Sequence, residues 1–123
     1  LSGAAYSRRH SIEIDLTKAL PKGYVLQCCL RRDVNDLSAP TYSLYINNTY
    51  KHIISAKKKM FCATSNYILS TSREDFNSDS VSVLGKCRSN FLGTVFNGYT
   101  PGKNPDTAKD KGPIRANIVT VKY

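Results

Sequence analysis

Three consecutive lysines, Lys57, Lys58 and Lys59, form the densest group of charges in the sequence. Adjacent ammonium groups repel one another unless water, salt or an anion screens them. Lysine side chains hold phosphate groups as point charges, and each lysine close to an anionic bilayer adds about 1 kcal/mol of attraction. The run is therefore a candidate site for a polyanion, and the alternative is a solvated strand end that binds no ligand.

A second basic pair, Lys86 and Arg88, is separated by a single residue. In a β-strand two such side chains project from the same face of the sheet, so their charged groups lie close together. An arginine in that position can make bidentate hydrogen bonds to a phosphate group. The pair is the natural partner of the lysine run, and the alternative is that both residues simply cover a solvent-facing sheet.

Motifs for catalysis, cofactor binding or metal binding are not found in the sequence. Nothing brings the two histidines, His10 and His52, together as the acid and base of a small ribonuclease. The sequence has no G-x-S-x-G motif, no Walker loop and no H-E-x-x-H motif. The four cysteines lack a C-x-x-C spacing, which favours reduced, buried thiols over a zinc site or a disulfide scaffold. We therefore expect a protein that is not an enzyme, with no catalytic residues, no metal and no cofactor.

The overall charge of the chain favours an anionic partner. Its 123 residues include 18 Lys and Arg against 9 Asp and Glu, which gives a formal net charge of +9. Such an excess favours nucleic acid, an anionic membrane face or a polyphosphate as partner. The length allows one domain with a core, and no apolar run approaches the roughly 20 residues of a membrane-spanning helix.

The elements that must position the basic residues are predicted to be strands, because the dominant hydrophobic period is two. Ser72 followed by acidic residues predicts one helical turn at most. Residues 1–11 are expected to be a flexible basic leader, and residues 12–123 are expected to form the domain. Seven strand candidates predict an all-β sandwich or barrel, and they cover residues 24–31, 42–46, 50–56, 64–70, 81–88, 91–99 and 114–123.

Four blocks of the sequence resemble the tubby domain. They are P-T-Y-x-L-Y at residues 40–45, the basic run that starts at Lys57, T-S-N-Y-I-L-S at residues 64–70, and G-K-C-R-S-N-F-L-G-T-x-F at residues 85–96. The last block is the most specific, because it matches the family signature G-K-x-R-S-N-(F/L)-(L/M)-G-T-x-F at every fixed position. The resemblance covers about residues 24–104 and continues more weakly to residue 123.

The resemblance implies an all-β fold, a closed antiparallel barrel threaded by a hydrophobic helix. The family domain is longer than this chain, so only the first part of the barrel is expected in residues 12–123, without the central apolar helix. A second chain or a missing segment is then expected to complete the barrel, and the alternative is a shortened domain that closes differently. An open half-barrel exposes a strand edge and an unfilled interior, so we expect the chain alone to be prone to aggregation.

The resemblance also implies a function, that of a phosphoinositide-binding adaptor. Tubby-like domains bind phosphatidylinositol bisphosphate head groups in a basic pocket on the barrel wall. Carried over to this sequence, the implied site residues are Lys57, Lys58, Lys59 and Arg88, with Lys86 beside them. The implied location is cytoplasmic, at the periphery of the plasma or ciliary membrane, and the nucleus is the alternative.

Two other functions remain open at this point. Tubby proteins have been discussed as transcription regulators, and the net charge of +9 permits contact with nucleic acid. The chain could also be a structural piece of a larger assembly with a degenerate lipid site. The structural alternative is favoured by three residues that stand where the family often has further basic residues: Met60, Phe61 and Cys62.

Overall fold

The structure is a computed structural model of the chain, and it describes residues 15–16, 18–35, 38–47, 49–103, 106, 112 and 114–123. The leader predicted at residues 1–11 lies outside the described residues. The described part contains no helix, and therefore none that is long and apolar enough to cross a membrane.

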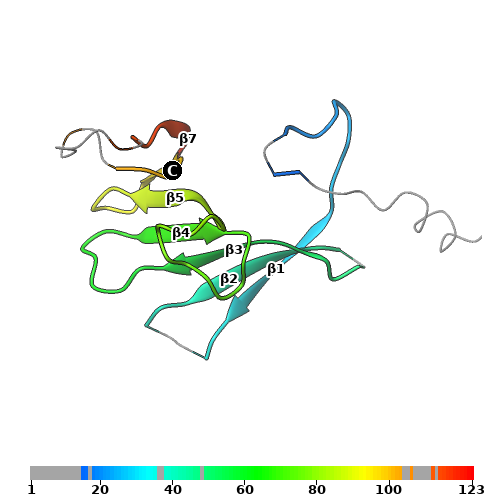
Figure 1. The fold of residues 1–123 in the computed structure, drawn as a ribbon, viewed down its shortest axis with the longest axis horizontal. Coiled ribbons are helices and arrows are strands. Elements are labelled where there is room, and N and C mark those ends of the chain that lie inside the picture. Colours follow the sequence, from blue (N-terminus) through cyan, green and yellow to red (C-terminus); the bar gives the residue numbers. More distant parts are fainter. Residues whose placement is uncertain are drawn as a thin grey trace, which may run out of the picture.

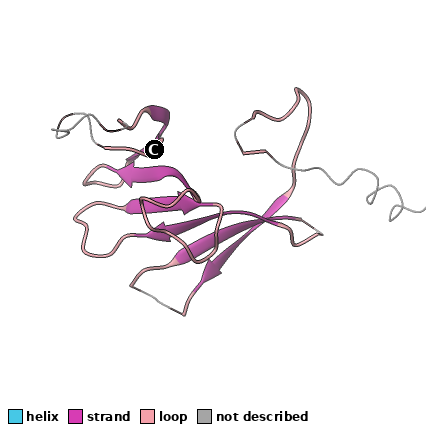
Figure 2. Ribbon diagram, in the orientation of Figure 1, coloured by secondary structure: helices cyan, strands magenta, loops and turns pink. Residues whose placement is uncertain are grey.

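Seven strands form a single antiparallel sheet in which each strand pairs with its neighbours in the chain, so the prediction of an all-β fold is confirmed (Figures 1 and 2). The sheet is not closed, because β1 and β7 pair on one side only among the described strands. This is the arrangement expected of the first part of a barrel. The strands are β1 (Cys28–Asp33), β2 (Thr41–Ile46), β3 (His52–Lys58), β4 (Asn66–Ser70), β5 (Val83–Ser89), β6 (Val95–Tyr99) and β7 (Asn117–Lys122).

The register gives the sheet one polar and one apolar face. Residues directly opposite one another in an antiparallel pair share a face, and residues two apart in a strand do as well. We call the face that carries Thr41, Lys57, Ile68 and Lys86, which are opposite one another in β2 to β5, the polar face. The apolar face carries two further rows, Tyr42, Ala56 and Leu69, and Lys58, Tyr67 and Cys87.

The apolar face remains partly open to solvent. Leu30 on β1 is 65% exposed and Val119 on β7 is 52% exposed. Across the described residues the buried hydrophobic side chains are Ala39, Ile68 and Val83, which is a small core for a sheet of this size. The open sheet thus leaves apolar side chains exposed on both of its edge strands.

A long loop between β4 and β5, residues 71–82, folds back over the polar face (Figure 1). The fully buried Ser70 anchors it, because its hydroxyl donates to the carbonyl of Asp75 at 2.7 Å. The helical turn predicted after Ser72 is a bend instead. The Ser72 hydroxyl still accepts hydrogen bonds from the backbone N–H groups of Glu74 and Asp75. Ser72 thus makes the hydrogen bonds of a helix N-cap, although no helix follows it in the described part of the chain.

Gly85, the first residue of the signature block, is required by close packing of the backbone. A Cβ at this position would lie 2.2 Å from the carbonyl oxygen of Tyr99 on β6. Any side chain would therefore push β5 away from β6. The glycine allows the two strands to stay in contact at the point where Lys86 begins the basic pair.

Candidate functional site

The basic side chains predicted for the site come largely from one face of the sheet. Lys57 lies opposite Ile68, and Ile68 lies opposite Lys86, so both lysines are on the polar face. Lys59 continues beyond β3, where its backbone N–H donates to the carbonyl of Asn66 at 2.7 Å. Because the faces alternate along a strand, Lys59 and Arg88 share the polar face with Lys57 and Lys86.

The two basic segments, which are predicted to form one site, do not lie on adjacent strands. Strand β4 lies between β3 and β5. Lys57 and Lys86 are therefore separated by two strand spacings, about 10 Å, with the buried Ile68 between them. A ligand that contacts both must span that width.

Lys58 is not brought to the other four predicted residues. It lies opposite Tyr67, which in turn lies opposite Cys87, so its side chain belongs to the apolar face. The physical reason is the period of two along a strand, which turns the middle lysine of a run away from its neighbours.

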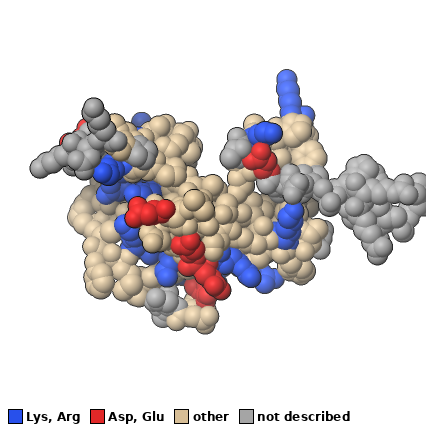
Figure 3. Space-filling model, in the orientation of Figure 1, with Lys and Arg blue, Asp and Glu red and all other residues tan. Residues whose placement is uncertain are grey.

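Three cations, Lys59, Arg88 and Arg115, lie close enough to Lys86 to affect its protonation. Burial lowers the pKa of Lys86, and the nearby positive charges of Lys59, Arg115 and Arg88 lower it further, while Asp79 opposes them. We call Lys59, Lys86, Arg88 and Arg115 the basic cluster. In Figure 3 basic side chains gather over β4 and β5, with acidic side chains beside them. A lysine whose charge is disfavoured in this way gains free energy when an anion binds next to it.

Asn66 on β4 is a polar member of the site that the sequence analysis did not single out. It lies directly opposite Arg88 and is 9% exposed. Its Oδ1 has no hydrogen-bond partner among the described residues, and a buried polar atom in that state costs free energy. Its position in T-S-N-Y-I-L-S, two residues before Ile68, is the signal that could have placed it on the polar face.

Arg115, just before β7, is the other member that sequence reasoning missed. Its guanidinium lies over the Tyr99 ring, 4.2 Å from the centroid. Its backbone N–H donates to the carbonyl of Lys103 at 3.0 Å, and its buried Nε has no hydrogen-bond partner in the described part of the chain. No local pattern marks Arg115, because only the pairing of distant segments brings it to Lys86.

A cavity of about 340 Å³ lies beside the lysine run. Its size falls in the range of small-molecule sites. The ammonium group of Lys57 points at the ring of Phe76, 5.9 Å from the centroid, which holds the 71–82 loop against the sheet. The lining consists of Ala39, Lys57, Lys58, Lys59, Met60, Ile68 and Phe76.

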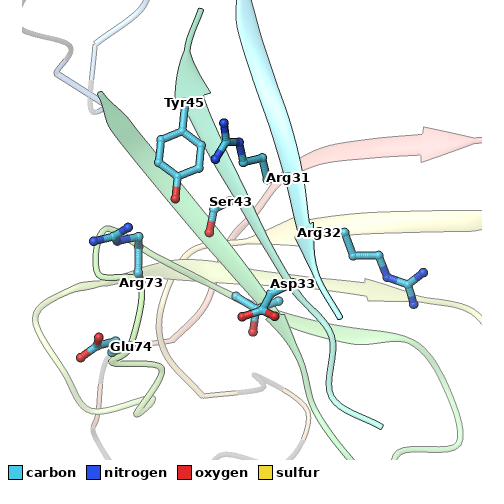
Figure 4. Close-up of a pocket in the computed structure, with 8 residues that line it drawn as sticks. Arg31, Arg32, Asp33, Ser43, Tyr45, Arg73 and Glu74 are labelled. Atoms are coloured by element: carbon cyan, nitrogen blue, oxygen red, sulfur yellow. The ribbon is translucent and has the colours of Figure 1, made fainter. Parts of the chain in front are cut away.

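A second cavity of about 440 Å³ lies on the same face near β1 and β2 (Figure 4). In Figure 4 the Arg73 guanidinium lies near the Tyr45 hydroxyl, and Asp33 and Glu74 are the acidic side chains of the lining. A hydrogen bond to Tyr45 raises the pKa of Arg73. Because its cations have partners and its lining includes carboxylates, this cavity suits a polyanion less well than the basic cluster does.

A chain of hydrogen bonds under the second cavity resembles the parts of a hydrolase but cannot act as one. The His52 Nε2 lies 2.7 Å from the Ser55 hydroxyl, which lies 2.6 Å from the Ser43 hydroxyl. Burial and the charge of Arg73 lower the pKa of His52, which favours the neutral ring. Ser55 is only 1% exposed, so its hydroxyl is closed to a substrate.

Residues that could hold a metal ion do not come together in the described part of the chain, which contains no group of three or more His, Cys, Asp or Glu side chains. The basic cluster and Asn66 instead supply cations and an amide group. Such groups bind anions through charge and hydrogen bonds.

Comparisons with known proteins agree with the resemblance. The model of the family described as "Tub family" matches residues 16–123. Tubby-related protein 3 of Mus musculus is 30% identical over 112 residues, which are 84% of this chain and 24% of that protein. Protein king tubby 2 of Aedes aegypti is 31% identical over 118 residues, which are 91% of this chain and 28% of that protein. Tubby-like F-box protein 9 of Arabidopsis thaliana is 30% identical over 122 residues, 94% of this chain and 31% of that protein.

The chain thus spans less than a third of the length of each of these relatives. The family match, in contrast, covers most of the chain, and the open seven-stranded sheet agrees with part of a tubby barrel. The chain belongs to the Tub family.

Proposed function

We propose that the chain supplies the head-group site of a phosphoinositide-binding, membrane-associated adaptor without catalytic activity. The observation that carries the proposal is the gathering of Lys59, Arg88 and Arg115 around the half-buried Lys86, whose pKa they lower. Cations that lie close together repel one another, which raises the free energy of the unliganded site. A ligand with several negative charges offsets this repulsion.

The chemistry of the cluster matches a phosphorylated sugar ring. Arg88 can bind one phosphate group through two parallel hydrogen bonds, while Lys59 and Lys86 act as point charges on others. Asn66, opposite Arg88, can offer amide donors to phosphate oxygens or accept from a ring hydroxyl. A bisphosphorylated inositol head group has both kinds of partner on one rigid ring, so it fits the mixture of charged and neutral groups.

The proposed setting is the cytoplasmic leaflet of the plasma or ciliary membrane, where anionic lipids attract basic surfaces. Each lysine or arginine near such a leaflet contributes about 1 kcal/mol, so a cluster of four supports reversible recruitment. Nucleic acid is the competing partner, because the net charge of +9 also favours a duplex. A duplex presents phosphates along a strand and would draw on basic residues all over the surface rather than on one cluster.

Sedimentation with vesicles separates the two partners. The chain is mixed with vesicles that contain phosphatidylinositol bisphosphate, and with control vesicles in which phosphatidylserine supplies the same total charge. A duplex DNA titration is run in parallel over a range of salt concentrations. We expect binding to the bisphosphate vesicles well above the control. Equal binding to both vesicles, together with a steep salt dependence on DNA, would overturn the proposal in favour of nucleic acid.

A further inference from the structure

Apolar side chains are exposed at the tips of two hairpins. Phe91 and Leu92, between β5 and β6, are 81% and 79% exposed, and Phe61, between β3 and β4, is 99% exposed. Both tips lie at the same end of the sheet. The Ser89 backbone N–H donates to the carbonyl of Ser65 at 2.9 Å, which ties the start of one tip to the end of the other.

Both tips have defined turn conformations, and their apolar side chains are directed outward. At the β5–β6 tip the Asn90 Oδ1 accepts hydrogen bonds from the backbone N–H groups of Thr94 at 2.9 Å and Val95 at 3.2 Å. Gly93 closes this turn with a φ of +70°. At the other tip Phe61 itself has a φ of +58°, which is strained for an aromatic residue.

Two cations of the basic cluster, Lys59 and Arg88, lie next to the tips. Arg88 is three residues from Phe91, and Lys59 is two residues from Phe61. Both charges therefore lie close behind the exposed apolar side chains, as in interfacial protein segments that bury apolar groups at the boundary between head groups and acyl chains.

Exposure alone does not identify this surface. Val81 is 100% exposed, but it precedes β5 and therefore lies at the opposite end of that strand from Phe91. The distinguishing feature of the tips is that their exposed apolar groups and two cations of the basic cluster, Lys59 and Arg88, lie at one end of the sheet. An anionic bilayer is the partner that offers both a negative surface and an apolar interior.

We propose that Phe61, Phe91 and Leu92 insert into the acyl-chain boundary of an anionic bilayer while the basic cluster holds its head groups. The inference rests on the proposed function and adds the orientation of the chain, with both hairpin tips directed into the membrane. Met60, which precedes Phe61 and is 44% exposed, adds apolar contact at the same tip.

Two assays on the same variants test the insertion. Calorimetric titration with soluble inositol trisphosphate measures the head-group site alone, and sedimentation with phosphatidylinositol bisphosphate vesicles measures the site together with the tips. The variants are Phe91→Ser with Leu92→Ser, Phe61→Ser, and the control Val81→Ser. We expect both tip variants to keep the affinity for the soluble head group and the double variant to lose about 10- to 100-fold in vesicle binding. The control should match the unchanged chain in both assays.

Vesicle binding of the tip variants equal to that of the unchanged chain would overturn the insertion. So would a parallel loss of soluble head-group affinity, because the tips would then only support the fold of the site. A smaller oligomer in sedimentation velocity, with vesicle binding unaltered, would assign the tips to a second copy of the chain and also overturn it. If the unchanged chain does not bind the soluble head group at all, the proposed function fails, and that result is distinct from the other three.

Discussion

Asn66 and Arg88 lie directly opposite one another on β4 and β5, on the face that also carries Lys86. The amide is buried, its Oδ1 has no partner within the described residues, and the guanidinium beside it is part of the basic cluster. A neutral amide next to an arginine leaves the cation available to a ligand, whereas a carboxylate would neutralise it. The pair therefore combines an open charge with an unused hydrogen-bonding group.

Asn66→Asp tests this relationship with a change of one atom. The new carboxylate lies opposite Arg88, pairs with it and repels phosphate. We expect the affinity for soluble inositol trisphosphate to fall about 10- to 100-fold, the equivalent of one charged hydrogen bond, while circular dichroism shows an unchanged sheet. An undiminished affinity would remove Asn66 from the site.

The three lysines of the run are expected to differ in function because they lie on different faces. Lys59→Ala should weaken binding to bisphosphate vesicles roughly fivefold, the value of one lysine near an anionic surface. Lys58→Ala is the matched control, since its side chain is on the apolar face with Tyr67. If both variants lost the same affinity in sedimentation assays, the run would act through its total charge and not through the site.

Head-group binding should depend on alkaline pH through Lys86. Burial and its cationic neighbours lower the pKa of free Lys86 below 10.5, and a bound phosphate reverses that effect. Affinity is therefore complete while Lys86 is protonated, and it falls as the pH rises through the lowered pKa. The phosphate groups lose their second proton near pH 6, so they do not titrate in this window.

Calorimetric titration between neutral pH and pH 10.5 measures this dependence, with Lys86→Arg as the comparison. Arginine remains charged throughout the window, so the variant should lose affinity only at higher pH than the unchanged chain. Identical pH profiles would show that Lys86 does not contact the phosphates.

The strands that carry the site show how much of the fold can be predicted from the sequence. The alternation of side chains in residues 81–88 predicts β5 almost as observed. A strand paired on both sides must direct its side chains alternately to the two faces of the sheet, so the pattern is strong there. The strand predicted to begin at residue 24 begins only at Cys28 in the structure. Residues 24–27 alternate as a strand does, but they have no partner strand to pair with among the described residues. Alternation therefore predicts where side chains point but not where pairing starts.

The site itself was predictable only within single strands. A spacing of two residues placed Lys86 and Arg88 on one face, and the same rule separates Lys58 from its neighbours. The position of β4 between the basic segments depends on strand order, which alternation does not encode. Arg115 joins the cluster through long-range pairing for the same reason.

The open sheet should make the isolated chain self-associate. Strand β7 is an edge, and Val119 and Val121 on it are 52% and 44% exposed on the apolar face. We expect oligomers in sedimentation velocity at micromolar concentration. Val119→Lys with Val121→Lys should reduce them without altering head-group affinity, because an edge with inward-pointing charges pairs poorly. A monodisperse monomer with a cooperative melting transition would contradict the expectation of an incomplete barrel.

Titration of the unchanged chain, Arg88→Ala and Lys86→Ala with soluble inositol trisphosphate tests the head-group site most directly, because it excludes the membrane and because the two variants change only the proposed site. We expect saturable binding by the unchanged chain and a loss of about 10- to 100-fold in each variant, as for a charged hydrogen bond removed from a shared ligand. Absence of saturable binding by the unchanged chain, or equal binding by all three proteins, would contradict the assignment of this face as a phosphoinositide site.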